Sequence, residues 1–447
     1  MNAPSRAVPM LMLAVVITCG PLTAQEIRFK VVPYTIDNGL KVLALEDHTL
    51  PVVSYYTFFG VGSRNETPGR TGVSHLFEHM MFNGSKNYPA GEFDRRLESN
   101  GGVSNAFTSE DMTVYYESFP SDTLPLVIQM EADRMVGLQL TEEMLQSERD
   151  VEKEERRLRV DNDVQGDMME LLRATAYVAH PYQWPVIGWM ADLDAITVDD
   201  CRAYYRAHYA PNNATIVMVG DFKPDQVITM INAAYGSIAS QPAAPAVVRN
   251  EPPQRGERRA LLRREAQLPA VAIAYHVPPV QVVDVMALDL LETILAGGDS
   301  ARLVRALVHE QQLATRVEVF NSWRSDPSDF LIYAEAKPGV TAAVLEAAMQ
   351  AEIARLVADG VGESELQKAK NVRTTSLVKS LKTSAGKAEQ LGLFELLFGS
   401  HTKLFNILKT YQSLGKEPLQ KVAAFYLTAD NRTVVTLVPA TVTEAAQ

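Results

Sequence analysis

Two short apolar stretches of this chain recur in its second half, each displaced by 218 residues. Pro51–Tyr55 (PVVSY) is echoed by Pro269–Ile273 (PAVAI), and Asn213–Val217 (NATIV) by Asn431–Val435 (NRTVV). The equal displacement favours a duplicated domain over two unrelated domains, although two short matches can also arise by chance. The length of 447 residues independently favours two domains, because single cores rarely grow beyond about 250–300 residues.

The segment 240–259 (SQPAAPAVVRNEPPQRGERR) is rich in proline, alanine and charged residues and has no apolar periodicity. This composition is typical of a linker. We therefore expect an N-terminal domain at residues 25–239, a linker at residues 240–259 and a homologous C-terminal domain at residues 260–447.

Apolar runs and turn residues predict the main elements of the first domain. Strands are expected at residues 29–35, 40–45, 52–61, 103–107, 112–119 and 214–219, and helices at residues 73–82 and from 141 to beyond 159. This mixture indicates an α+β fold, in which each of two homologous domains is a mostly antiparallel sheet packed with helices.

The first 24 residues have the three parts of a secretory signal peptide. Arg6 supplies a positive charge, Met10–Ile17 supplies a short apolar stretch, and residues 22–24 (LTA) supply a small-residue cleavage site. We therefore expect a bacterial protein exported to the periplasm. Two alternatives stay open: a retained N-terminal anchor, and lipidation of Cys19, which the preceding Thr18 disfavours.

The charge, the apolar segments and the cysteines of the chain limit which partners and cross-links we expect. The net charge is −12 and no basic stripe is present, which argues against nucleic acid as a partner. No segment after the signal peptide is apolar enough to cross a membrane. Removal of the signal peptide would leave Cys201 as the only cysteine, so we expect no internal disulfide.

Residues 75–79 (HLFEH) have the spacing of a metal site on a helix. Residues four apart lie on one helix face, so His75 and His79 can bind the same zinc ion. Glu78 flanks that face and can reach a water at the ion without being a ligand. The alternative is a pair of solvent-facing histidines on an amphipathic helix. The apolar residues around the pair weaken this alternative, because buried histidines need partners.

A catalytic zinc ion requires a third protein ligand. The acidic helix expected from residue 141 onward offers Glu152, Glu154 and Glu155, and spacing alone does not choose among them. Glu148 and Glu155 are seven residues apart and therefore share one helix face. The alternative interpretation of this segment is a solvated charged helix.

The second half repeats the metal motif without its histidines. Residues 289–293 (DLLET) align with residues 75–79 (HLFEH), so Asp289 and Thr293 stand where the first half has histidines. If the halves are homologous, only the first half holds metal.

Three segments together resemble the pitrilysin–insulysin family of zinc peptidases, in its branch of short, two-domain chains similar to the mitochondrial processing peptidase. The segments are HLFEHMMFNGSKNYP (75–89), GGVSNAFTSEDMTVYY (101–116) and SERDVEKEERRLR (147–159). The resemblance implies a zinc metalloendopeptidase with one zinc ion per chain. It also implies that Glu155 is the third ligand, that Glu78 is the general base and that Glu148 assists.

The resemblance also implies how a substrate binds. Members of the family hold a peptide as an added strand, between two halves that close like a clamshell, and the matching residues here are Asn105, Ala106 and Phe107. The alternative for these residues is an ordinary hairpin strand, with Phe107 in the core.

One departure from the family concerns the substrate clamp. Active members usually have an arginine and a tyrosine seven residues apart in the second domain, and Val308 and Thr315 stand at these positions here. The hypothesis that follows is a heterodimer, in which this chain is the zinc-bearing subunit and a zinc-less homologous partner supplies the clamp. A catalytically weak structural or assembly subunit of the same family is the alternative.

Overall fold

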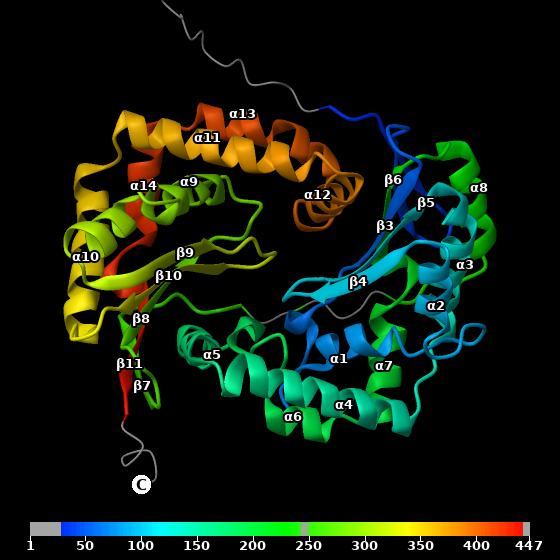
Figure 1. The fold of residues 1–447 in the computed structure, drawn as a ribbon, viewed down its shortest axis with the longest axis horizontal. Helices are drawn as coiled ribbons and strands as arrows, with labels where there is room; N and C mark the ends of the chain where they lie inside the picture. Colours follow the sequence, from blue (N-terminus) through cyan, green and yellow to red (C-terminus); the bar gives the residue numbers. More distant parts are fainter. Residues whose placement is uncertain (1–27, 243–246, 248–249, 441–447) are drawn as a thin grey trace, which may run out of the picture.

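The computed structural model describes residues 28–242, residue 247 and residues 250–440. The signal peptide predicted at residues 1–24, with Cys19, lies outside these ranges. The described residues form two similar halves, shown side by side in Figure 1. No helix within them has the length and apolar character needed to cross a membrane.

The first half is built on a six-stranded sheet. Its strands in chain order are β1 (Val31–Thr35), β2 (Lys41–Glu46), β3 (Val52–Phe59), β4 (Val103–Thr108), β5 (Thr113–Pro120) and β6 (Ala214–Gly220). In space they lie in the order β1-β2-β6-β3-β5-β4. β2 and β6 pair in parallel, and the other neighbours are antiparallel. β4 is therefore an edge strand.

The second half repeats this topology. Its strands are β7 (Arg258–Arg264), β8 (Ala270–Val277), β9 (Ala314–Asn321), β10 (Ser328–Ala336) and β11 (Arg432–Pro439). The spatial order β7-β11-β8-β10-β9 matches β2-β6-β3-β5-β4 strand for strand, including the single parallel pair. The duplication indicated by the 218-residue displacement is thus present in the fold. β7 begins at Arg258, so the last two residues predicted for the linker belong to this strand.

Helices surround both sheets. The first half contains α1 (Val73–Met80), α2 (Glu92–Ser99), α3 (Leu124–Gly137), α4 (Glu142–Arg156), α5 (Val164–Ala176), α6 (Met190–Ala195), α7 (Val198–His208) and α8 (Pro224–Tyr235). The second contains α9 (Asp284–Ala296), α10 (Ala342–Asp359), α11 (Glu363–Ser380), α12 (Ser384–Leu397), α13 (Ile407–Ser413) and α14 (Lys416–Tyr426). α4 starts at the Thr141 cap and continues into a π-helical turn, Arg157–Asp161. The helix predicted to extend beyond residue 159 is therefore present, but its last turn has π-helical instead of α-helical hydrogen bonds.

The two halves exchange one helix each. α5 follows α4 in the first half but packs on β7, β8 and β11, where Met168 and Leu172 are buried against the second sheet. α12 belongs to the second half but packs on β3 and β6 of the first sheet. Each sheet therefore has one face covered by a helix from the other half, and neither core is complete on its own.

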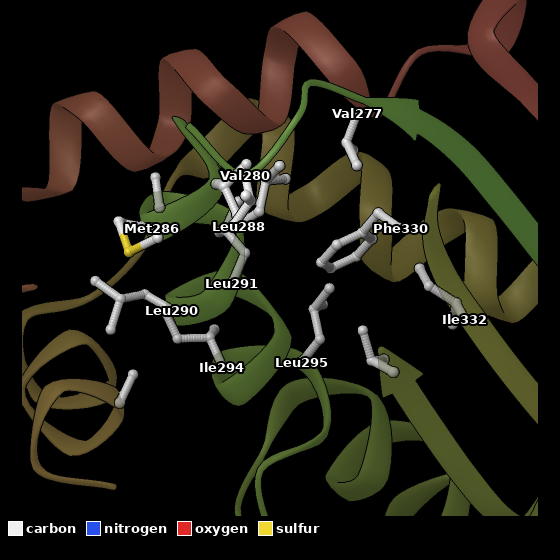
Figure 2. Close-up of a cluster of buried hydrophobic side chains, with 14 of the residues drawn as sticks. Val277, Val280, Met286, Leu288, Leu290, Leu291, Ile294, Leu295, Phe330 and Ile332 are labelled. Atoms are coloured by element: carbon white, nitrogen blue, oxygen red, sulfur yellow. The ribbon is translucent and has the colours of Figure 1, made fainter. Parts of the chain in front are cut away.

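The core of the second half is centred on α9. Nearly every residue of this helix is buried, which is the pattern of a helix enclosed on all sides. Figure 2 shows Leu288, Leu291 and Leu295 beside Phe330 of β10 in this cluster. The segment aligned with the metal motif is thus the central helix of an apolar core.

A buried ionic network joins the β4–β5 turn of the first half to the β9–β10 turn of the second. Arg324 donates to Asp329 (2.6 Å) and to Glu110 (2.6 Å), and its side chain is buried. Arg64 of the first half pairs in turn with Asp326 of the second (2.7 Å). A buried charge that loses its partner destabilises the folded protein, so the opposite charges of this network stabilise one another.

We expect Arg324→Met to lower the stability of the chain by about 3–5 kcal/mol, because the buried Asp329 would lose its cation and Glu110 would keep only the longer pair with Arg173 (3.4 Å). The measurement is the midpoint of urea denaturation. Arg202→Met on α7 is the control, since Arg202 is an exposed residue paired with the exposed Asp199. Equal shifts for the two variants would contradict a structural role for the network.

Candidate metal centre

The predicted motif lies on α1, and specific contacts fix the N-terminus of this helix. The buried Glu66 accepts hydrogen bonds from the backbone N–H groups of Gly72 (2.9 Å) and Ser74 (2.8 Å), which have no partners within the helix. Gly72 adopts a φ of +92°, and a Cβ there would come within 2.8 Å of the carbonyl oxygen of Ile187. The first turn of α1 is therefore set by a carboxylate cap and by a glycine that has no room for a side chain.

α4 lies against α1 and directs three glutamates toward the two histidines. Glu152 Oε1 lies 3.0 Å from His75 Nδ1, and Glu148 Oε2 lies 3.5 Å from His79 Nδ1. Glu155 lies on the other side of both rings, 3.9 Å from His75 Nε2 and 3.4 Å from His79 Nε2. Each imidazole thus has one nitrogen engaged by a glutamate and the other directed toward Glu155.

This arrangement fits a zinc ion held by His75, His79 and Glu155. One ligand atom from each lies within 4.8 Å of the others, and no second such group of three occurs among the described residues. Ligand atoms around a tetrahedral zinc ion are about 3.4 Å apart when each bond is about 2.1 Å long. Only small side-chain movements would bring the three together on one ion.

The structure distinguishes among Glu152, Glu154 and Glu155, the three candidates for the third ligand between which the sequence spacing did not choose. Glu152 is fully buried and bonds to His75 through the nitrogen that faces away from Glu155. Glu154 is exposed and pairs with Arg157. Glu155 alone faces both imidazoles. The contact of Glu152 with His75 is one that sequence analysis missed, although the spacing of 148, 152 and 155 along one helix face indicates it.

Local electrostatics favour a neutral His75. Burial, with the charges of His79 and Arg159 adding to it, lowers the pKa of His75 to about 3. Burial alone would lower the pKa of His79 as well, but Glu148 and Glu155 raise it. A neutral imidazole is the form that binds metal. Arg159 also forms an ion pair with Glu155 (2.9 Å).

Glu78 lies beside the three candidate ligands and is not one of them. Burial raises the pKa of its carboxyl, and the hydrogen bond from Thr108 Oγ1 (2.6 Å) partly opposes this effect. A carboxylate with a raised pKa is a better proton acceptor near neutral pH. Thr108 is the last residue of β4, so the predicted substrate strand contacts the predicted base directly.

We expect Glu152→Leu to weaken zinc binding about 10–100-fold, because the partner of a metal-bound histidine fixes its ring orientation and tautomer. A competition titration against a chromogenic chelator measures this affinity. Glu154→Leu is the matched control on the same helix, since its carboxylate is exposed and faces away from the histidines. An unchanged zinc affinity in Glu152→Leu would refute this role.

The corresponding place in the second half holds a guanidinium. Arg373 of α11 lies 218 residues after Glu155, the displacement of the repeat, and pairs with Glu292 (2.9 Å), the counterpart of Glu78. Asp289 accepts hydrogen bonds from Trp323 (3.0 Å) and Tyr411 (2.7 Å). A fixed cation and fully bonded carboxylates leave no ligand set for a metal ion here.

The predicted substrate residues lie on the free edge of the first sheet. Asn105, Ala106 and Phe107 belong to β4, whose only strand neighbour is β5. Ala106 packs toward the core beneath α1, and Phe107 packs on the opposite face of the sheet. The backbone of β4 is thus able to pair with an added strand.

Neither an arginine nor a tyrosine stands at the two positions of the expected clamp. Val308 is half-buried and packs against the core of the second half. Thr315 lies in β9 and donates a hydrogen bond to Glu335 (2.8 Å). Neither side chain offers the cationic or phenolic group that the family resemblance leads us to look for.

Known proteins share this organisation. Residues 41–188 match the family described as "Insulinase (Peptidase family M16)", and residues 195–373 match "Peptidase M16 inactive domain". The zinc protease PqqE of Helicobacter pylori is 34% identical over 412 residues, covering 91% of this chain and 92% of PqqE. The chain belongs to peptidase family M16. The resemblance drawn from its three motifs is therefore confirmed.

Two solved protease structures have the same fold. A protease from Helicobacter pylori superposes with a TM-score of 0.89 at 32% identity, covering 92% of this chain and all of that one. The periplasmic protease PqqL of Escherichia coli superposes with a TM-score of 0.75 at 21% identity. That match covers 93% of this chain but only 48% of PqqL, so PqqL is about twice as long.

Proposed function

We propose that this chain is a zinc-dependent endopeptidase that hydrolyses peptides or unfolded protein segments. The observation that carries the proposal is the convergence of His75, His79 and Glu155 on one point, with Glu78 beside them and the edge strand β4 adjacent. Its relatives named as zinc proteases support zinc as the metal.

Each residue of the site has its own role in the proposed reaction. His75, His79 and Glu155 would hold the zinc ion, which supplies Lewis acidity toward the scissile carbonyl and its attacking water. Glu78 takes a proton from the attacking water and delivers it to the leaving amine. Thr108 fixes the orientation of Glu78 through its hydrogen bond. Glu148, itself held by Asn83 (2.6 Å), orients His79.

Substrate binding is proposed at β4. A peptide paired with the backbone of residues 105–107 would run past Thr108 and hence past Glu78. Backbone pairing gives affinity with little sequence preference, and pockets for alternate side chains add selectivity. Unfolded segments suit this mode, because folded substrates have few free strands.

We further propose that the active form is a heterodimer with a zinc-less homologous partner. Val308 and Thr315 lack the chemistry of a carbonyl clamp, so a second chain is needed to supply it. The superposition on only 48% of PqqL supports pairing, since one chain of that protein has room for two such units. The name of PqqL as a periplasmic protease also supports export of this chain to the periplasm.

Co-purification from the native host tests the pairing. We expect the tagged chain to retain a homologous chain that lacks the H-x-x-E-H motif. The complex should cleave a quenched peptide at least tenfold faster than the isolated chain does. Equal rates for the isolated chain and the complex would refute the heterodimer and leave the peptidase intact.

A structural or assembly subunit is the second candidate. The match of residues 195–373 to an inactive domain and the Arg373–Glu292 pair in the second half are compatible with it. Metal analysis of the purified complex separates the two functions. Bound zinc with peptide cleavage supports the peptidase, and a complex without either supports the scaffold.

A further inference from the structure

The second sheet has one strand fewer than the first. In the first sheet β1 pairs with the outer edge of β2, whereas β7, the counterpart of β2, pairs only with β11 among the described strands. The linker before β7 does not take this place. Its Glu251 accepts hydrogen bonds from the backbone N–H groups of residues 178–180, and Pro252 and Pro253 have no N–H group to donate. β7 is therefore an open edge.

β7 exposes an apolar side chain between two arginines. Burial alternates along the strand, and its exposed residues are Arg259, Leu261 and Arg263. The exposed fraction of Leu261 is 52%, and a Cβ at Gly256, two residues before β7, would meet nothing within 4 Å apart from its chain neighbours. An open edge of seven residues with an exposed leucine is a surface to which another strand can pair. The structure thus offers both an unpaired strand and space beside its start.

β7 carries opposite charges near its two ends, on one face. Glu257, directly before the strand, bonds to Arg259 and to an arginine of β11. Arg263, near the other end, is the one arginine of β7 with no hydrogen bond or ion pair to a residue in the described ranges. The other three arginines are each paired with a carboxylate. Alternate residues of a strand point the same way, so Glu257 and Arg263 share the face of Leu261.

An antiparallel copy of β7 complements these charges. The start of one strand then lies beside the end of the other, so each Glu257 can face the Arg263 of the second copy. This register also places the apolar side chain of Leu261 opposite the stem of Arg259. In the alternative register, with Leu261 opposite its own copy, Arg259 would face Arg263, and like charges directly opposite are destabilising. Charge therefore favours the first register.

We propose that β7 is a self-association surface, at which two copies of this chain join their five-stranded second sheets into one sheet of ten strands. The β7 strand of the second copy takes the place that β1 has in the first sheet. Two-fold symmetry makes each contact occur twice, including the pair of Glu257 with Arg263. β4 and the candidate metal centre belong to the first half and stay free, so the proposal does not depend on the peptidase function.

The strength of this contact follows from its size. One added strand pair is small beside the roughly 1,200–2,000 Å² that stable interfaces bury, so we expect a dimer that dissociates on dilution, with a dissociation constant on the order of 10 µM. Sedimentation equilibrium of the purified chain over about a hundredfold range of concentration around that value measures it. The average mass should rise from that of one chain toward that of two. The mass of one chain at every concentration would overturn the proposal.

Two substitutions test whether β7 is the contact. Leu261→Lys should weaken the association at least about tenfold, because it removes the apolar contact and adds a cation opposite Arg259. Arg263→Glu should weaken it as well, since Glu257 of the second copy would then face a like charge. Leu50→Lys is the matched control, because Leu50 is an equally exposed leucine in the first half (63%).

Hydrogen exchange gives a second readout that does not depend on any variant. The backbone amides of residues 256–264 should exchange more slowly at concentrations at which the wild type is dimeric than after dilution. The same comparison for Leu261→Lys should show no difference. Equal association of Leu261→Lys and Leu50→Lys, or a dimer without protection at these amides, would place the contact elsewhere and overturn the proposal.

Discussion

Glu78→Gln is expected to lower kcat for peptide cleavage roughly 10²–10⁴-fold, the usual contribution of a general base, while the zinc content stays unchanged. Glutamine has nearly the shape of glutamate and can still accept the hydrogen bond from Thr108, so the edge strand keeps its contact with α1. It cannot take a proton from water. The rate should therefore fall without a loss of metal or of peptide binding.

The measurement combines cleavage of a quenched peptide with metal analysis of the same preparation. Glu154→Gln on α4 is the control for loss of one carboxylate near the site, since Glu154 is exposed and turned away from it. Near wild-type cleavage by Glu78→Gln would assign the base to another residue. Loss of zinc together with activity would instead make Glu78 part of the metal site.

Local sequence patterns predicted the elements that carry this site. The helix at Val73–Met80 and the hairpin at Val103–Pro120 follow from periodicity and turn residues, which act over a few positions. The displacement of 218 residues predicted a second sheet of the same order, because homologous sequences repeat their topology. Patterns of this kind need no knowledge of distant contacts.

The features that sequence analysis missed depend on distant contacts. The exchange of α5 and α12 between the halves is not visible in either helix, because an apolar face does not specify which sheet it covers. The partner role of Glu152 required the position of α4 relative to α1. In the sequence, Arg373 is one of several charged residues in a helix. Only its ion pair with Glu292 in the structure shows that it lies opposite the altered motif.

Glu155→Gln is expected to remove most of the bound zinc and the stability that zinc confers. A ligand present at 100 times its dissociation constant stabilises a protein by about 2.7 kcal/mol, so zinc should raise the unfolding temperature of the wild type measurably. The variant lacks the anionic ligand that faces both imidazoles, and its midpoint should not respond to zinc. Metal analysis after dialysis and thermal unfolding with and without zinc provide the two readouts.

Comparison with Glu148→Gln and Glu154→Gln makes this experiment decisive, because the three glutamates share one helix and each substitution removes one charge. Glu148 contacts His79 through Nδ1, on the side away from Glu155, so its variant should keep zinc with reduced affinity. Glu154 should behave as wild type. If Glu148→Gln loses zinc and Glu155→Gln retains it, the ion is bound through the Nδ1 atoms. The proposed orientation of both imidazoles would then be wrong.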